Sequence, residues 1–368
     1  MKERFTFRYK DRNYTLDCNR MEIYYNSNKL KLNFNKYKSS TLYLKITSNC
    51  NMVCNYCFQS NDIKNINIPI LQNYKKLLKN AIEAHDKVVI FGGEPFLREN
   101  IENINYLFTF RKKYFFYSNG IFDSTTRKFI IENKDKILKI VISIDGTKNI
   151  HNNRRHSSID SFERIIDNIK ILLENSIEVI IQINVDSENI NSINNLLDFI
   201  VNNFNYKNLK IVLNRVLHRN NDITEFMLLE KFVNLKNKYN SLDLRINSTI
   251  LEKLADFFER GFYSKERCNI GNTKILDFTT NDIYICPMNY MTNIGGFNKD
   301  TVILNTKLID IFKKKVSEKN FRKCTTCCYK YFCNKGCIND DIINFNTCMY
   351  EVESIIQFIM DRYHIFFD

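Results

Sequence analysis

The chain has 368 residues, 44% of them hydrophobic and 26% charged, and its formal net charge is +13. These values are typical of one large globular α/β domain with a smaller appended part, and they exclude a minimal domain that depends on disulfides. The sequence contains no run of 18 apolar residues, so no membrane-spanning helix is predicted. The first residues lack the apolar core of a signal peptide. We therefore expect a cytoplasmic protein without a membrane partner.

Twelve cysteines in a cytoplasmic chain indicate metal binding or catalysis rather than disulfides. The positive net charge suits either an anionic partner, such as nucleic acid or an acidic peptide, or a lysine-rich surface exposed to solvent. No basic run with interleaved aromatic residues predicts a nucleic-acid platform, so nucleic acid is not expected among the partners.

Residues 1–38 predict a small N-terminal β-rich segment. Apolar or aromatic residues alternate with polar ones in four short runs, which asparagine, aspartate and arginine separate. The strands predicted from these runs cover residues 5–9, 14–17, 21–25 and 30–34.

Residues 39–220 change to strands that alternate with helices. The apolar runs predict strands at residues 42–47, 87–91, 114–117, 139–144, 178–185 and 209–213, and helices at residues 71–84, 99–111, 124–133, 159–174 and 190–203. Nearly continuous apolar strands indicate a parallel sheet covered by helices, and the alternation allows either a doubly wound sheet or a barrel. Residues 221–264 predict a helical bridge, residues 265–350 a cysteine-rich domain, and residues 351–368 a C-terminal helix.

Three cysteines follow the strand predicted at residues 42–47 with the spacing C-x3-C-x2-C: Cys50, Cys54 and Cys57. Thiolates on one loop can each bind one iron of a 4Fe–4S cluster, which leaves the fourth iron without a protein ligand. An open iron can bind a chelating ligand through an amino and a carboxylate group. The main alternative is a structural zinc site, which needs four ligands where this loop supplies three.

With this spacing, at the strand end where barrels place their chemistry, the sequence resembles the radical S-adenosylmethionine (SAM) superfamily. The resemblance implies an α/β fold with a partial (β/α)6 TIM-like barrel. It also implies that Cys50, Cys54 and Cys57 hold a 4Fe–4S cluster whose open iron binds SAM. Tyr56, directly before Cys57, could shield the cluster and pack on the adenine.

A GGEP segment follows the strand predicted at residues 87–91; it consists of Gly92, Gly93, Glu94 and Pro95. Two glycines let the backbone approach a ligand closely, and a carboxylate beside them can accept hydrogen bonds from an ammonium group. The segment is similar to the one that holds the SAM amino group in the family, so Glu94 is the candidate partner of that group. An ordinary strand-to-helix turn is the alternative.

Further candidate SAM contacts end the next strands. Ser118 and Asn119 follow the strand predicted at residues 114–117, and Ser143 and Asp145 stand at the end of the strand predicted at residues 139–144. The resemblance implies that they contact the SAM ribose or carboxylate. Helix capping is the alternative. Arg155 stands where relatives place an arginine that binds the carboxylate, or else it is a surface cation.

The C-terminal cysteines form a second pattern. Cys268 precedes Asn281 by thirteen positions and Cys286 follows it by five; later come Cys324, Cys327, Cys333, Cys337 and Cys348. This pattern resembles the SPASM domain, which carries two auxiliary 4Fe–4S clusters, while one or two zinc ribbons are the alternative. The family usually has glycine at the position of Asn281, and asparagine also tolerates left-handed backbone geometry.

The resemblance assigns Cys324, Cys327, Cys333 and Cys348 to a distal cluster, and Cys268, Cys286 and Cys337 to a proximal one. Only three thiolates then serve the proximal cluster. A substrate thiolate could bind its open iron, or Cys18, Cys328 or water could complete it.

The resemblance as a whole implies an enzyme that cleaves SAM reductively to a 5′-deoxyadenosyl radical and modifies a ribosomally made precursor peptide. The leading product is a cysteine thioether cross-link, and a C–C cross-link or formylglycine formation in a sulfatase are the enzyme alternatives. Relatives that make formylglycine carry an aspartate base directly after the cysteine that corresponds to Cys286, where this chain has Pro287. A non-catalytic Fe–S or zinc scaffold is the alternative outside enzymes.

The implied cofactors are SAM and three 4Fe–4S clusters. The implied partners are the precursor peptide and an electron donor such as flavodoxin or ferredoxin. The predicted N-terminal sheet could bind the leader of such a peptide as an added strand at its edge. The sequence identifies no catalytic base.

Overall fold

The computed structural model of the chain describes residues 4–17, 19–20, 22–31, 39–59, 68–157, 160–204, 207–216, 223–259, 273–287, 292–311, 329–333 and 348–367. The predictions made for Cys18, Cys268, Cys324, Cys327, Cys328 and Cys337 lie outside these residues, as do the side chain of Cys348 and most of the strand predicted at residues 30–34.

A four-stranded antiparallel sheet begins the chain and confirms the predicted N-terminal β segment. Its order is β1-β2-β3-β4, formed by Arg4–Tyr9, Arg12–Asp17, Glu22–Tyr25 and Asn28–Lys29. Side chains alternate along β1, so Phe5, Phe7 and Tyr9 are buried on one face. The Phe5 ring lies 5.7 Å from the Tyr329 ring, and the Phe7 ring 6.4 Å from the Phe332 ring. The first strands therefore pack on elements from the end of the chain.

A second sheet contains the parallel strands predicted for residues 39–220, and it confirms the α/β class. The order along it is β13-β12-β11-β9-β8-β7-β5-β14-β15-β16-β17. Neighbours from β13 to β5 pair in parallel: β5 (Thr41–Thr47), β7 (Lys87–Gly92), β8 (Tyr114–Ser118), β9 (Ile137–Ser143), β11 (Val179–Val185), β12 (Leu209–Arg215) and β13 (Leu244–Ile246). Among the described strands, β13 and β17 pair on one side only, so the sheet is open.

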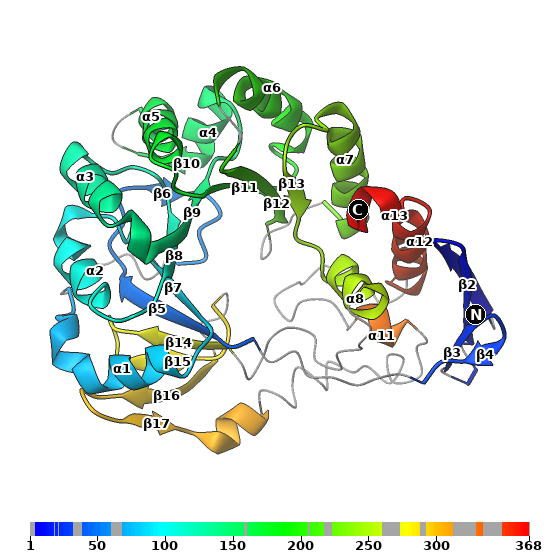
Figure 1. Cartoon of the computed structure of the whole chain (residues 1–368), viewed down its shortest axis with the longest axis horizontal. Coiled ribbons are helices and arrows are strands. Elements are labelled where there is room, and N and C mark those ends of the chain that lie inside the picture. The colour runs from blue at the N-terminus through cyan, green and yellow to red at the C-terminus, as the bar shows by residue number, and fades with distance from the viewer. Residues whose placement is uncertain are drawn as a thin grey trace.

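Helices connect these strands and lie along the outer side of the curved sheet in Figure 1. They are α1 (Lys75–Glu83), α2 (Ile101–Leu107), α3 (Ser124–Glu132), α4 (Lys148–Arg154), α5 (Ser161–Glu174), α6 (Ile193–Asn203) and α7 (Glu225–Lys238). Short 3-10 helices cover η1 (Leu71–Tyr74), η2 (Arg98–Asn100), η3 (Lys134–Lys136) and η4 (Ile190–Ser192). In α5, buried Phe162, Ile165, Ile169 and Leu172 recur every three or four residues, which places one apolar face on the sheet. Helix α4 was not predicted from the sequence.

Two segments in the second half of the chain differ from the predicted organisation. The predicted bridge, residues 221–264, is not purely helical, because β13 lies between α7 and α8 (Thr249–Phe258) and adds a parallel strand beside β12. A strand of three residues is too short to give a periodic signal. Within residues 265–350, β14 (Thr273–Asp277) pairs in parallel with β5. Strands β15 (Asp282–Tyr284), β16 (Asn293–Phe297) and β17 (Val302–Leu304) extend the same sheet.

Asn281 connects β14 to β15 with a φ of 61°, so the left-handed geometry expected at this position is confirmed. Its side-chain oxygen accepts a hydrogen bond of 2.8 Å from the Tyr74 hydroxyl. This contact ties the turn between β14 and β15 to η1.

The described residues near the end of the chain include the short helix α11 (Lys330–Cys333), within the predicted cysteine-rich domain. Two helices, α12 (Cys348–Met360) and α13 (Tyr363–Phe367), follow where one helix was predicted for residues 351–368. Buried Ile355, Ile356 and Ile359 of α12 share an apolar cluster with the N-terminal sheet and α8. Figure 1 shows α12 beside β2. Within the described ranges, no helix is long and apolar enough to span a bilayer.

A buried ion pair joins the parallel strands to β14. Lys45 on β5 and Asp277 on β14 are register partners, and Lys45 Nζ lies 3.0 Å from Asp277 Oδ2. Their side chains are 2% and 1% exposed. The other oxygen of Asp277 accepts hydrogen bonds from the amide and the hydroxyl of Thr279 at 2.9 and 2.5 Å. Because the pair is dry, loss of one charge leaves the other without compensation.

We expect Asp277→Asn to lower the free energy of unfolding by about 3–5 kcal/mol, because Lys45 then remains charged in a buried site. Anaerobic denaturant unfolding measures this change. The double variant Lys45→Met/Asp277→Leu should recover most of the loss. The control is Asp11→Asn, which breaks the exposed pair with Arg8 and should change stability by less than about 1 kcal/mol. Equal stability of Asp277→Asn and Asp11→Asn would contradict this account of the pair.

Candidate functional site

A cavity of about 380 Å³ opens where the parallel strands end. Successive parallel strands bring their carboxyl ends to one edge of the sheet, and ligands bind at that edge in α/β folds. Ten residues predicted to hold the cluster or SAM line this cavity: Cys50, Cys54, Tyr56, Cys57, Gly92, Gly93, Ser118, Asn119, Ser143 and Arg155. The structure therefore brings together side chains that lie more than 100 positions apart in the chain.

The loop after β5, residues 48–59, is called the cysteine loop below and carries the half-buried Cys50, Cys54 and Cys57, none of which is in a disulfide. Its short strand β6 (Val53–Cys54) pairs with β10 (Arg155–His156), so that Cys54 lies opposite Arg155. The amide of Asn55 donates to the carbonyl oxygen of Arg154 at 2.9 Å. The middle of the loop is thus fixed by the segment that follows α4.

The start of the cysteine loop packs on the two glycines of the GGEP segment. The amide of Gly93 donates to the Thr47 carbonyl oxygen at 3.0 Å, and the amide of Glu94 donates to that of Asn49 at 2.8 Å. A Cβ atom at either Gly92 or Gly93 would lie 2.1 Å from a carbonyl oxygen of this segment, and Gly92 has a φ of 148°. Glycine is therefore required here for the approach of two backbones, in addition to any approach of a ligand.

Glu94 lies behind the cavity wall and holds the residues that form it. Its carboxylate accepts hydrogen bonds from the Phe96 amide (2.9 Å), the Ser118 hydroxyl (2.9 Å) and the Asn119 amide (2.6 Å). Burial raises the pKa of Glu94 to about 7, against the lowering effect of these donors. Its predicted contact with the SAM amino group remains a prediction, because the described structure uses both oxygens within the protein.

Asn119 connects the end of β8 to the cysteine loop. Its side-chain nitrogen lies 2.6 Å from Asn51 Oδ1 and 3.7 Å from Cys50 Sγ. Burial raises the pKa of Cys50 to about 12, and the nearby charge of Glu94 adds to this effect. The thiolate form of Cys50 therefore needs a compensating cation, as a bound metal provides.

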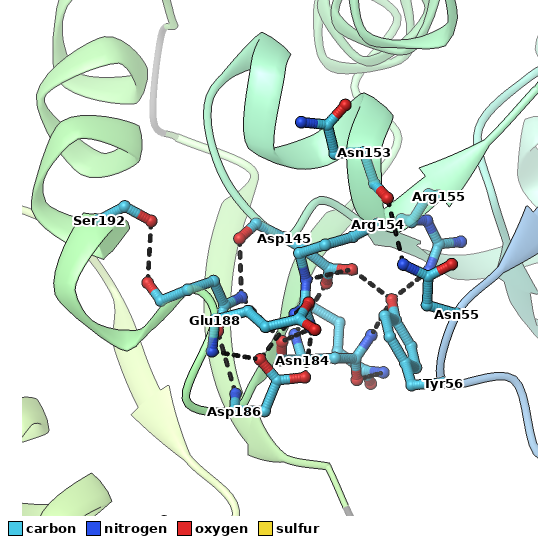
Figure 2. A network of polar contacts seen from close by, with 12 residues as sticks. Asn55, Tyr56, Asp145, Asn153, Arg154, Arg155, Asn184, Asp186, Glu188 and Ser192 are labelled. Carbon is cyan, nitrogen blue, oxygen red and sulfur yellow. Dashed lines mark hydrogen bonds and ion pairs between the residues drawn. The ribbon is translucent and has the colours of Figure 1, made fainter. Parts of the chain in front are cut away.

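The Tyr56 hydroxyl is held by three side chains (Figure 2). Its hydroxyl donates to Asp145 Oδ2 and accepts hydrogen bonds from Arg155 Nη1 at 2.5 Å and from Asn184 Nδ2 at 3.1 Å. Asp145 is fully buried and also accepts from the Asn184 amide at 3.0 Å. Asp145 therefore orients Tyr56 and is not among the residues that line the cavity, and its contact with SAM remains a prediction.

Arg154 joins these groups to the end of β11 (Figure 2). Its guanidinium donates two hydrogen bonds to Asp186, at 2.6 and 2.8 Å, and one to Glu188 at 2.7 Å. It also lies 3.7 Å from Asp145 Oδ2, and its Cζ atom lies 5.1 Å from the centre of the Tyr56 ring. The side chain is 3% exposed, so this is a buried bidentate ion pair that fixes the back of the cysteine loop.

The remaining predicted residues differ in their exposure to the cavity. Ser143 lines it, and its hydroxyl has no hydrogen-bond partner among the described residues. The Nε atom of Arg155 is buried and likewise has no partner in the described part of the chain. Pro95 is buried beside Glu94 and does not line the cavity. Ser143 and Arg155 thus retain donors for a ligand, whereas Glu94, Pro95 and Asp145 lie in the supporting wall.

The sequence analysis missed several polar residues of the site. Arg154, beside the predicted Arg155, carries the buried ion pairs, and Gln182, Asn184, Asn214 and Asn247 line the cavity. The amide side chains at the ends of β11 and β12 could have indicated them, because polar residues are unusual in strands that are otherwise apolar. Nothing in the spacing of Arg154 and Arg155 distinguishes their roles.

The donor set of the cysteine loop fits a 4Fe–4S cluster. Three thiols on one loop line one cavity, and soft thiolate ligands are those that iron–sulfur clusters use. In the described residues, no three histidine, cysteine, aspartate or glutamate side chains are arranged to hold a single metal ion. The unpartnered donors of Ser143 and Arg155 fit the hydroxyl and carboxylate groups of SAM.

Comparison with known proteins gives a matching family for this part of the chain. Residues 44–200 match the radical SAM superfamily. The cysteine-type anaerobic sulfatase-maturating enzyme of Clostridium novyi (strain NT) is 32% identical over 159 residues, which are 38% of this chain and 42% of the relative. The same enzyme type from Clostridium perfringens is 25% identical over 253 residues, 63% of each chain. This chain therefore spans less than two thirds of the curated relatives it matches.

Solved structures with a similar fold cover more of the chain. Native anSMEcpe with bound AdoMet aligns with a TM-score of 0.66 and 18% identity, covering 86% of this chain and 97% of the other. SuiB of Streptococcus suis bound to its precursor peptide SuiA aligns with a TM-score of 0.59 and 17% identity, covering 81% and 71%. At these identities the similarity establishes the shared fold.

We expect Arg154→Lys to destabilise the protein by about 1.5–3 kcal/mol, because an ammonium group cannot reproduce the bidentate hydrogen bonds to Asp186. The midpoint temperature of thermal unfolding and the iron content after anaerobic reconstitution should both decrease, since the cysteine loop loses its support. The control Arg164→Lys changes an exposed arginine on α5 and should leave both values unchanged. If the two variants behave alike, Arg154 does not hold the loop.

Proposed function

Because residues 44–200 belong to the radical SAM superfamily, we propose that this enzyme cleaves SAM reductively and uses the resulting radical to modify a ribosomally synthesised peptide. The observation that carries the proposal is the common cavity. Cys50, Cys54 and Cys57 line one side of it, and the candidate SAM contacts from β7, β8, β9 and β10 line the adjacent wall. A scaffold that only stores iron or zinc has no need of such a cavity beside its cysteines.

When bound, a 4Fe–4S cluster supplies the electron that breaks the C–S bond of SAM. The chain's own residues bind and orient. Arg155 offers a buried cation for the SAM carboxylate, and Ser143 offers a hydroxyl for the ribose. Tyr56, fixed by Asp145, Arg155 and Asn184, covers the cluster side of the cavity.

The proposal includes two auxiliary 4Fe–4S clusters in a SPASM region. Cys286 and Cys333 are the two of its cysteines whose side chains are described, and both are half-buried. Cys286 packs on the core of the parallel sheet, whereas Cys333 packs on the separate apolar cluster that includes the N-terminal sheet. This separation supports their assignment to different clusters, proximal for Cys286 and distal for Cys333.

A cysteine thioether is the product we propose. Closing a C–S bond removes one hydrogen atom from carbon, which the 5′-deoxyadenosyl radical accepts to become 5′-deoxyadenosine, and it removes one proton and one electron from the thiol. An oxidised auxiliary cluster is the class of acceptor proposed for that electron. SuiB has been solved with a precursor peptide, which supports a peptide substrate for a chain of this fold. A C–C cross-link follows the same electron count.

Formylglycine formation is the second candidate, because the curated relatives are sulfatase-maturating enzymes. Pro287 lines the cavity directly after Cys286, where the resemblance places an aspartate base. Among the described residues that line the cavity there is no aspartate or glutamate. Both observations favour the cross-link. An electron donor such as flavodoxin or ferredoxin, and a cytoplasmic location, remain part of the proposal.

We expect the anaerobically reconstituted protein to form 5′-deoxyadenosine from SAM in the presence of dithionite. Cys54→Ala should reduce the rate at least about a hundredfold, because cleavage requires the cluster. Liquid chromatography of the quenched reaction measures the product. Asn203→Ala, a change on the exposed surface of α6, should retain the wild-type rate. A wild-type protein that carries the cluster and forms no 5′-deoxyadenosine would contradict the proposed function.

The product can be assigned by mass spectrometry of a short cysteine-containing peptide encoded beside the gene and co-expressed with it. A cross-link removes two hydrogens and keeps the sulfur, and a thioether also resists alkylation by iodoacetamide. Formylglycine formation from cysteine removes the sulfur. Loss of sulfur would replace the thioether by the second candidate.

A further inference from the structure

Four side-chain amides form a continuous hydrogen-bonded row on the cavity wall, here called the amide ladder: Gln182, Asn184, Asn214 and Asn247. Asn247 Nδ2 donates to Asn214 Oδ1 at 3.3 Å, and Asn214 Nδ2 donates to Asn184 Oδ1 at 3.4 Å. Gln182 Nε2 donates to the same Asn184 oxygen at 3.0 Å. Asn184 Nδ2 then donates to the Tyr56 hydroxyl at 3.1 Å, so the ladder runs from the cysteine loop to the outermost parallel strand.

The register of the sheet places these amides on one face. Gln182 and Asn184 are two positions apart on β11, and side chains two apart on a strand share a face. Asn184 and Asn214 are direct register partners of β11 and β12. The Asn247 amide extends the pairing by donating to the Leu213 carbonyl oxygen at 2.9 Å. Strands β11 and β12, and the residue that directly follows β13, therefore each present an amide to the cavity at adjoining positions.

The ladder retains hydrogen-bonding capacity. A primary amide has two N–H donors and one oxygen, and each Asn or Gln here uses only one of its donors within the ladder. In the described part of the chain, neither Asn247 Oδ1 nor Gln182 Oε1 has a hydrogen-bond partner. The four amides thus offer donors and acceptors side by side, and they carry no charge themselves.

Aromatic side chains line a different part of the cavity, which is called the aromatic wall below. Tyr43, Phe58, Phe91 and Tyr117 line the cavity, with the Tyr43 and Phe91 rings 5.6 Å apart and nearly perpendicular. The charged residues among the described lining are Arg155, at the cysteine loop, and Arg215, at the end of β12. A ligand between the two walls therefore needs neutral donor–acceptor pairs on one side and apolar groups on the other.

We propose that the outer amides of the ladder, Asn214 and Asn247, bind the backbone amides of the substrate peptide, which lies extended between the ladder and the aromatic wall. A peptide unit presents one N–H and one C=O, which pair with the oxygen and nitrogen of a side-chain amide. This inference rests on the proposed function, since it assigns the substrate of the same cavity. It names the backbone beside the reacting cysteine, and not the flanking sequence, as what the site recognises.

The test uses a blocked pentapeptide with cysteine at its centre and alanine elsewhere, together with two analogues in which an ester replaces the amide before or after the cysteine. Binding to the reconstituted, SAM-loaded protein is measured by anaerobic calorimetry, without reductant and hence without turnover. For the wild-type protein, at least one ester should bind about three- to tenfold more weakly than the all-amide peptide, the value of one neutral hydrogen bond.

The double variant Asn214→Ala/Asn247→Ala should bind the all-amide peptide more weakly, to a similar extent. The difference in affinity between the amide and ester peptides should also disappear, because the side chains that bond to the peptide amide are gone. Asn203→Ala is the matched control and should keep the wild-type difference. The single variant Asn247→Ala, which lies beyond the end of β13, gives the same comparison if the double variant does not fold.

An amide-to-ester difference that persists in these variants overturns the inference, and so does a wild-type protein that fails to bind the all-amide peptide at millimolar concentration. Formation of 5′-deoxyadenosine is measured separately on the wild-type protein. Ladder-dependent binding by a protein that never forms 5′-deoxyadenosine would support the inference and contradict the proposed function.

Discussion

The structure depends on holding three thiols of one irregular loop in fixed positions beside a cavity. The cysteine loop has almost no regular structure of its own, because β6 covers only Val53–Cys54. Its geometry comes from other parts of the sheet: the glycines after β7, Asn119 after β8, Asp145 after β9 and the segment before β10. Many of these contacts end in a backbone carbonyl or a buried charge, so they tolerate few substitutions.

The polar residues of the site fall into two groups by position. Glu94, Asp145, Arg154 and Asp186 are almost fully buried and bond to other protein groups, so they orient the wall. Cys50, Cys54, Cys57, Ser143 and Arg155 line the cavity itself. This division places charged groups where their partners are fixed and leaves donors without partners where a ligand can bind. The amide ladder continues the lining to the last parallel strand with neutral groups.

Much of this site could be predicted from the sequence, because its signals are local. The cysteine spacing, the two glycines of the GGEP segment and most of the polar residues at the strand ends indicated positions that line the cavity, whereas Glu94, Pro95 and Asp145 lie in its supporting wall. The α/β class and the N-terminal sheet also followed from periodicity. Predictions failed where the determining contact is distant in sequence: β13 and β14 are strands because β12 and β5 offer open edges. No local pattern predicts that Lys45 pairs with Asp277, 232 positions later.

The distinction between Arg154 and Arg155 shows the same limit at the scale of one residue. Arg154 is the last residue of α4 and Arg155 the first of β10, and only the fold decides that Arg154 turns toward Asp186 while Arg155 lines the cavity. Glu94 shows the same limit, because a carboxylate after two glycines in the sequence is as compatible with binding an ammonium ligand as with a structural role. One of the two backbone amides that bond to it, that of Asn119, directly follows β8 and lies 25 positions later in the chain.

The central claim is that Cys50, Cys54 and Cys57 hold a 4Fe–4S cluster with one iron open to SAM. Electron–nuclear double resonance of the reduced protein with SAM labelled by 15N at the amino group and 17O at the carboxylate tests it most directly. The account predicts hyperfine coupling of both nuclei to the cluster, and its loss in Cys54→Ala. A reduced wild-type cluster that binds SAM without coupling to either nucleus would contradict it.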